Sequence, residues 1–331
     1  MKRDNIEFML GGLEALRRDD RQALLATLDP GVVWQGLEDE WLCSGPDEVV
    51  GVFTTQRDEA REVDALELIG AEHHGILHAR GGAVLHLAGT LARSAEEDLV
   101  VCAVVPSPWP PAPAQVDSEY RKFLDGMARA ALERARERLP GDVSAACLVH
   151  HARSAPAGLL EVAKRREAAM IVVGTSGHPA IGGVTARLLH SSPVPVALAP
   201  HGFRSRPDAR VERVTAAFGG SEGLVDAAAA VAARLGATLR IASFAVHAHA
   251  PFDADLVERW VRDTETAAGQ APTLVGHGAS WEEAIDHVEW RDGDVLVVGS
   301  SSAAPASRVF LGSRASRIIR HSPVPVVVVP R

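Results

Sequence analysis

The stretch "SRIIRHSPVPVVVVPR" at residues 316–331 reproduces an earlier one, "ARLLHSSPVPVALAP" at residues 186–200. Arg187 aligns with Arg317 and Pro193 with Pro323 at one constant offset. Proline cannot donate a backbone hydrogen bond, so each apolar run after "PVP" must begin a strand there or lie at a sheet edge. A repeat of more than a hundred residues is too long for a solenoid, whose period is about 20–50 residues. The two stretches therefore predict a duplicated domain.

The later unit, residues 211–331, is called the second domain, and its patterns alternate between strand and helix. Apolar and β-branched runs predict strands at residues 211–218, 238–246, 272–278, 294–300 and 324–330. Helical patterns lie between them at residues 224–236, 253–268, 280–293 and 313–321. Ser280 and Glu283 form a capping box for the third of these helices. Five strands joined by helical crossovers predict an α/β fold with a doubly wound parallel sheet.

The earlier unit, residues 76–201, is called the first domain and repeats this order. Strands are predicted at residues 97–105, 144–151, 169–176 and 194–200, with helices at 83–97, 117–139 and 154–168. The opening strand would fall on "GILHARGG" at residues 75–82, which is a poor strand pattern. The first domain is therefore expected to have a degenerate front edge. Residues 201–213, with several charges, Gly202 and Pro207, are the expected linker.

The amino-acid composition and charge argue against several classes of function. The chain has 331 residues, 47% of them hydrophobic, and a formal net charge of −9, so nucleic acid is not an expected partner. The opening residues lack the apolar core of a signal peptide, and no run approaches the roughly 18 apolar residues of a membrane span, so a cytoplasmic protein without membrane contact is expected. The three cysteines lie far apart, and adjacent histidines on a strand point to opposite faces, so no metal site is predicted.

Both domains place glycines where a buried strand meets the next helix. The candidate binding residues are Gly174, Gly177, Gly182 and Gly183 in the first domain and Gly299, Ser302, Gly312 and Ser313 in the second. In a doubly wound sheet the carboxyl ends of the strands form the ligand site, and a helix N-terminus offers free N–H groups to an anion. The alternative is structural, since glycine also lets a helix pack closely against a strand.

These glycine segments resemble the universal stress protein family. Its nucleotide-binding members carry Gly, two residues, Gly, nine residues, and then Gly followed by Ser or Thr. The second domain keeps this spacing with Ser302 at the second glycine, whereas the loop between Gly177 and Gly182 is five residues short and Gly183 replaces the hydroxyl residue. The resemblance implies two tandem five-stranded domains of the adenine-nucleotide-hydrolase-like superfold, with ATP as a candidate ligand of the second.

The resemblance also points to the turn after the first strand and to the last strand. Family members that bind ATP have an Asp-Gly-Ser turn that meets the nucleotide. The second domain has Gly219, Gly220 and Ser221 there, and the first has "HARGG", so the acidic residue is absent from both. In the family the last strand pairs with its counterpart in a second domain. The resemblance therefore implies a pseudo-dimer of the two domains within one chain, with a further homodimer as an extension.

Residues 1–75 differ in character and predict a small α+β segment. Asp29, Trp34 and Gly45 resemble the front part of a SnoaL-like domain of the nuclear-transport-factor-2-like fold, some of whose members are isomerases or cyclases. The segment is expected to be truncated, because the domain pattern begins where its remaining strands should be.

The chain as a whole carries no sequence motif of a catalytic site. It has no nucleophile elbow, no HExxH motif and no Walker lysine, so catalysis is not expected. The resemblance to the universal stress protein family implies regulation in a bacterial stress response. A scaffold that binds no nucleotide and associates through sheet edges is one alternative, and a SnoaL-like isomerase or cyclase in the N-terminal segment is the other.

Overall fold

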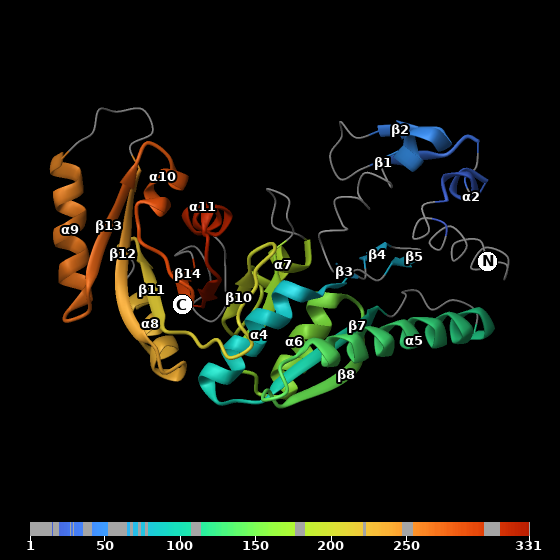
Figure 1. Cartoon of the computed structure of the whole chain (residues 1–331), viewed down its shortest axis with the longest axis horizontal. Coiled ribbons are helices and arrows are strands. Elements are labelled where there is room, and N and C mark those ends of the chain that lie inside the picture. Colours follow the sequence, from blue (N-terminus) through green and yellow to red (C-terminus); the bar gives the residue numbers. More distant parts are fainter. Residues whose placement is uncertain are drawn as a thin grey trace. The chain divides into compact units, whose positions relative to one another are not determined.

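The structure is a computed structural model (Figure 1). It describes residues 79–106, 114–175, 183–220, 223–246, 254–300 and 312–330. Before residue 79 it describes shorter pieces, namely residues 15, 20–26, 28, 30–35, 42–51, 65–66, 69–71 and 74–76. The chain divides into two compact units, residues 1–65 and 66–331.

The second domain is a five-stranded parallel sheet in the order β13-β12-β11-β14-β15. Its strands are β11 (Arg213–Phe218), β12 (Thr238–Val246), β13 (Thr273–Gly278), β14 (Asp294–Gly299) and β15 (Val326–Val329). Its helices are α8 (Leu224–Arg234), α9 (Ala254–Ala268), α10 (Trp281–Asp286) and α11 (Ser313–His321). All four residues of β15 are buried, as expected for a wholly apolar strand covered on both faces. The doubly wound fold is confirmed.

Local signals fix where α10 begins and ends. The Ser280 side chain accepts a hydrogen bond from the Glu283 backbone N–H at 3.1 Å, so the predicted N-cap is present. The helix ends at Asp286 instead of running to residue 293. The Trp290 indole N–H donates to the Ile285 carbonyl at 2.9 Å and satisfies one of the carbonyls that the helix end leaves open.

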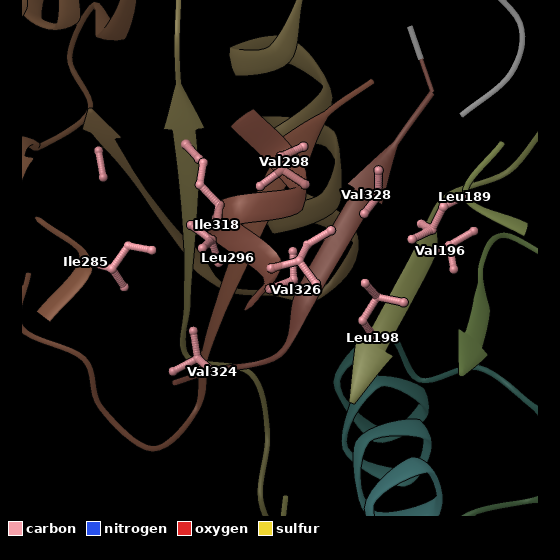
Figure 2. Packing of buried hydrophobic residues seen from close by; sticks show 14 of the residues in the cluster. Leu189, Val196, Leu198, Ile285, Leu296, Val298, Ile318, Val324, Val326 and Val328 are labelled. Carbon is pink, nitrogen blue, oxygen red and sulfur yellow. The ribbon is translucent and has the colours of Figure 1, made fainter. Parts of the chain in front are cut away.

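The duplicated strands pair with each other within one seven-stranded sheet. β10 (Val196–Ala199) of the first domain pairs antiparallel with β15, with Val196 opposite Val328 and Leu198 opposite Val326. Figure 2 shows these four side chains on adjacent strands within one apolar cluster. The repeated strand is thus the element through which the two domains join.

The repeated "SPVP" segment has the same local structure in both domains. Ser192 Oγ donates to the Val194 carbonyl at 2.7 Å and accepts from the Val194 N–H at 3.2 Å. Ser322 makes the same two bonds to Val324, at 2.8 and 3.3 Å. The serine therefore closes the turn across a proline that has no N–H of its own to offer.

The described strands of the first domain form two separate pairs. β7 (Leu99–Pro106) pairs in parallel with β8 (Ala145–Ala152), while β9 (Ile171–Gly174) pairs with β10 in the seven-stranded sheet. The remaining helices are α4 (Gly81–Ala95), α5 (Ala114–Arg138), α6 (Ala155–Arg165) and α7 (Gly183–Leu188). In the second domain β11 lies between the counterparts of β7 and β9. Among the described residues no strand of the first domain takes that place.

The segment before α4 is built from short strands. β4 (Ile69–Ala71) and β5 (His74–Ile76) pair antiparallel, and β3 (Ala65–Leu66) and β6 (Ala79–Arg80) are two residues each. The described residues of the weak strand pattern at 75–82, which leave out 77–78, do not lie in the parallel sheet. In the N-terminal unit α2 (Arg21–Ala26) is followed by β1 (Val33–Gln35) and β2 (Leu42–Ser44), which pair antiparallel.

The linker between the domains is held against α4. The Val211 N–H donates to Ser94 Oγ at 2.8 Å, and Arg93 Nη1 donates to the Ala209 carbonyl at 2.9 Å. Arg93 also pairs with Asp142 through two hydrogen bonds of 2.6 and 2.9 Å, and this pairing raises the pKa of its guanidinium. The linker is thus an ordered part of the domain contact.

Candidate functional site

The candidate site of the second domain lies where the strand order reverses. β11 is followed by α8 and pairs with β12 on one side and β14 on the other, so the carboxyl ends of β11 and β14 form the topological switch point. We call the backbone and side chains at these strand ends, together with the start of α11, the switch-point site. Its described candidate residues are Gly220, Gly299, Gly312 and Ser313.

Gly299 ends β14 and has a packing role. A Cβ built on it would lie 3.4 Å from Cδ1 of Leu224, the first residue of α8. Gly174 is its counterpart in the first domain, where a Cβ would lie 3.1 Å from Cγ2 of Val84 in α4. In both domains, then, the glycine lets a helix from earlier in the same domain, α8 or α4, approach the strand end closely.

Gly312 and Ser313 form the start of α11. Gly312 is the N-cap residue with extended backbone (φ −81°, ψ 164°) and gives no side-chain cap to the helix. Its carbonyl accepts hydrogen bonds from the N–H and the hydroxyl of Ser316, each at 3.0 Å. Because the first turn lacks a side-chain cap, its N–H groups face outward at the partially positive end of the helix.

The turn after β11 is built on glycine. Gly220 has a φ of +83°, a conformation that side-chain-bearing residues rarely adopt, and no atom lies within 4 Å of a Cβ built there. Ser221 and Ser302 lie outside the described residues, as do Gly177 and Gly182.

Arg314 is a site residue that the sequence did not reveal. Its Nη1 donates to the Gly219 carbonyl at 3.3 Å, so it links the start of α11 to the end of β11. The guanidinium carbon lies 4.9 Å from the ring centroid of Trp260 and 5.8 Å from that of Trp281. Burial lowers the pKa of the guanidinium, although the residue keeps an exposed side. The one available signal was the contrast between "GSR" at residues 312–314 and "GGV" at 182–184.

Two local interactions place the tryptophans. Ser243 Oγ of β12 and Thr264 Oγ1 of α9 are fully buried and 2.6 Å apart, which fixes α9 on the sheet one turn after Trp260. Trp281 is the first residue of α10 and follows the Ser280 cap directly. The indole positions are therefore set by the fold and not by contact with Arg314 alone.

The first domain offers a different arrangement. Thr185 Oγ1 donates to the Gly174 carbonyl at 3.0 Å, and the Thr175 N–H donates to the Ala199 carbonyl at 2.9 Å, so these polar groups are used within the domain. Gly183 is the first residue of the short helix α7, and Val184 stands where the second domain has Arg314. The two domains are thus not equivalent at their strand ends.

Charged groups at the opposite, amino end of β14 are structural. Asp294 is 3% exposed and accepts hydrogen bonds from Arg213 Nε at 2.9 Å, Arg213 Nη2 at 2.6 Å and the Arg291 N–H at 2.9 Å. Arg240 Nη2 lies 3.5 Å from the same carboxylate, and its guanidinium stacks over Trp290 at 5.1 Å. The hydrogen bonds to Asp294 raise the pKa of Arg213, whereas burial lowers that of Arg240.

The described residues contain neither a metal-binding cluster nor a membrane-spanning helix. No group of three or more His, Cys, Asp or Glu side chains that could hold a metal ion occurs there. The adjacent His150 and His151 bind Glu161 and Asp125 respectively, at 2.8 and 2.7 Å. No helix in the same part of the chain is long and apolar enough to span a bilayer.

Comparison with known proteins identifies the fold and both repeats. The model of the universal stress protein family matches residues 78–200 and 213–330. Universal stress protein Mb2346c of Mycobacterium bovis and universal stress protein Rv2319c of Mycobacterium tuberculosis are each 35% identical to this chain over 282 residues, covering 76% of it and 96% of the relative. The crystal structure of a universal stress protein from Archaeoglobus fulgidus shares 21% identity and a TM-score of 0.50, over 75% of this chain and 93% of that one.

The matched ranges correspond to the two domains and leave the N-terminal segment outside. The SnoaL-like interpretation of residues 1–75 therefore stays a prediction. Two family matches in tandem, together with the doubly wound sheet, show that this chain belongs to the universal stress protein family.

Proposed function

We propose that this protein is a regulatory stress-response protein that binds an adenine nucleotide at the switch-point site of its second domain. One observation supports the proposal most directly. α11 begins without a side-chain cap beside the carboxyl end of β14, in a domain whose five-stranded sheet is complete. An uncapped helix N-terminus at a topological switch point suits a phosphate group. In this proposal binding changes the state of the regulator and no chemical step is needed.

The test begins with the protein purified without added nucleotide. The denatured sample is assayed for released ATP, ADP and AMP, and the apo form is titrated with ATP by calorimetry. We expect stoichiometric binding that weakens by about tenfold or more in Gly312→Val and Ser313→Val, because a branched side chain then occupies the approach to the first N–H groups.

Gly141→Val is the matched control, since that glycine is exposed in a first-domain turn with no atom within 4 Å of an added Cβ. Its affinity for ATP should equal that of the unmodified protein. Absence of bound nucleotide and of any heat at millimolar ATP would reject nucleotide binding.

A scaffold that binds no nucleotide is the second candidate, and one observation favours it. The antiparallel pairing of β10 with β15 joins the domains through backbone and apolar contacts. The scaffold predicts no response to ATP and an oligomeric state that is the same with and without it. Size-exclusion chromatography with and without ATP, together with the calorimetry, distinguishes the nucleotide-binding regulator from the scaffold.

A further inference from the structure

Gly219 and Arg314 fit each other across the switch-point site. A Cβ on Gly219 would lie 2.7 Å from Arg314 Nη1 and 3.5 Å from its Cδ, so the guanidinium occupies the space that a side chain at residue 219 would need. Glycine at this position leaves that space free and also provides the carbonyl to which Nη1 donates. The positively charged guanidinium of Arg314, a residue of α11, therefore lies at the end of β11. It fills the space that a side chain at residue 219 would occupy.

Two indole rings hold this charge in place. Trp260 comes from α9 and Trp281 from α10, and both lie within the range of about 6 Å over which an aromatic face attracts a cation. The rings contact the cation through their faces and accept none of its N–H groups in conventional hydrogen bonds. The rings thus orient the guanidinium, and no carboxylate among the described residues neutralises it.

Within the described part of the chain, most of the N–H donors of Arg314 make no hydrogen bond. A guanidinium carries five N–H donors in a planar fork that matches the oxygens of a phosphate. Across the described residues, which leave out 301–311, Arg314 forms one hydrogen bond, to a neutral carbonyl, and no ion pair with a carboxylate. In contrast, Arg213 and Arg93 each direct two donors at an aspartate. Arg314 differs from these structural arginines because it has no carboxylate partner among the described residues, and such donors are what an anion-binding residue needs.

We propose that Arg314 is the phosphate-binding residue of the switch-point site, holding the polyphosphate of a nucleotide with a guanidinium clamped between Trp260 and Trp281. This rests on the proposed function for the nucleoside part of the ligand, whereas the phosphate contact stands on the geometry of Arg314 alone. The first domain has Val184 at the corresponding position and cannot make the same contact. This phosphate contact is therefore specific to the second domain.

The experiment titrates the full chain with ATP, adenosine and sodium tripolyphosphate, by calorimetry and by indole fluorescence. Arg314→Gln should raise the Kd for ATP and for tripolyphosphate by roughly 10–100-fold, the loss expected for charged hydrogen bonds, and leave adenosine unchanged. Arg314→Lys should have Kd values between those of the unmodified protein and those of Arg314→Gln, because lysine keeps the positive charge and lacks the planar fork of N–H donors. Arg317→Gln removes an exposed charge from the same helix and should bind like the unmodified protein. Ligand binding should also change the indole emission in every variant that retains Arg314. Circular dichroism and the Tm verify that each variant is folded.

The outcomes separate the two proposals. If ATP binds and Arg314→Gln binds it equally well, the phosphate role is wrong and nucleotide binding stands. If Arg314→Gln binds ATP more tightly, Arg314 obstructs the site and the inference is also overturned. If tripolyphosphate binds through Arg314 but neither ATP nor adenosine binds, the inference holds and the proposed function fails. If none of the three ligands binds, both are rejected.

Discussion

Replacing Asp294 with alanine should destabilise the second domain strongly. The carboxylate is 3% exposed and is the shared partner of two arginines whose side chains are 17% and 8% exposed, Arg213 and Arg240. Removing one partner of a buried ion pair costs about 3–5 kcal/mol, because the charge left behind is neither hydrated nor compensated. Two cations remain here, so we expect at least about 3 kcal/mol. That is a large part of the roughly 5–15 kcal/mol by which a domain is stable.

The measurement is the free energy of unfolding from urea titration, followed by circular dichroism and by indole fluorescence. Asp294→Asn is a useful companion, because it keeps the shape and removes the charge, and it should lose nearly as much stability. Arg291→Ala is the control. Its exposed side chain pairs with Glu289, while its contact with Asp294 is made by the backbone N–H, so a loss below about 0.5 kcal/mol is expected. A loss of less than 1 kcal/mol in Asp294→Ala would refute the reasoning, since the arginines would then have to be hydrated.

Three further predictions concern the domain contact, a buried thiol and the switch-point site. Leu198→Ala removes a side chain that is 1% exposed in the apolar cluster shared by both domains and should cost about 2–5 kcal/mol by urea titration; a smaller loss would mean that the cluster collapses around the cavity. Burial raises the pKa of the Cys102 thiol from 9.0 to about 11, so at pH 8 it should react with iodoacetamide about a hundredfold more slowly than in the unfolded chain, and equal rates would contradict the buried position. The same shift means that the thiol favours the folded state below pH 9 and that this contribution is lost as the pH rises from 9 to about 11. Gly219→Ala places a Cβ against the flexible end of Arg314 and should alter the indole emission while changing the unfolding free energy by less than about 1 kcal/mol; unchanged emission would show that Arg314 does not stack on the rings.

The sequence was most informative where local chemistry decides the structure. The apolar run at residues 326–329 could only be a buried strand, and the prolines before it restricted where pairing could begin. Ser280 and Glu283 predicted the start of α10 correctly for the same reason, since capping depends on residues three apart.

Features set by residues far apart in the chain could not be predicted in this way. The end of α10 depends on an indole that returns to the helix from outside it, at Trp290. The fit between Gly219 and Arg314 joins positions 95 residues apart and has no sequence period. Glycine at residue 219 suggested only that an acidic group was missing. The structure shows that the guanidinium of Arg314, from α11, fills that space, and this contact depends on the tertiary fold.

The antiparallel contact between β10 and β15 has a consequence for the timing of synthesis. Leu198 is translated more than a hundred residues before Val326, its partner. At about 5–20 residues per second the ribosome needs on the order of ten seconds for that stretch, and during this time β10 has an unpaired edge of apolar strand. A nascent first domain can be captured there by chaperones or by other nascent chains. Slow codons between the domains would lengthen this exposure, and expression yield should fall with them even though the finished protein is unchanged.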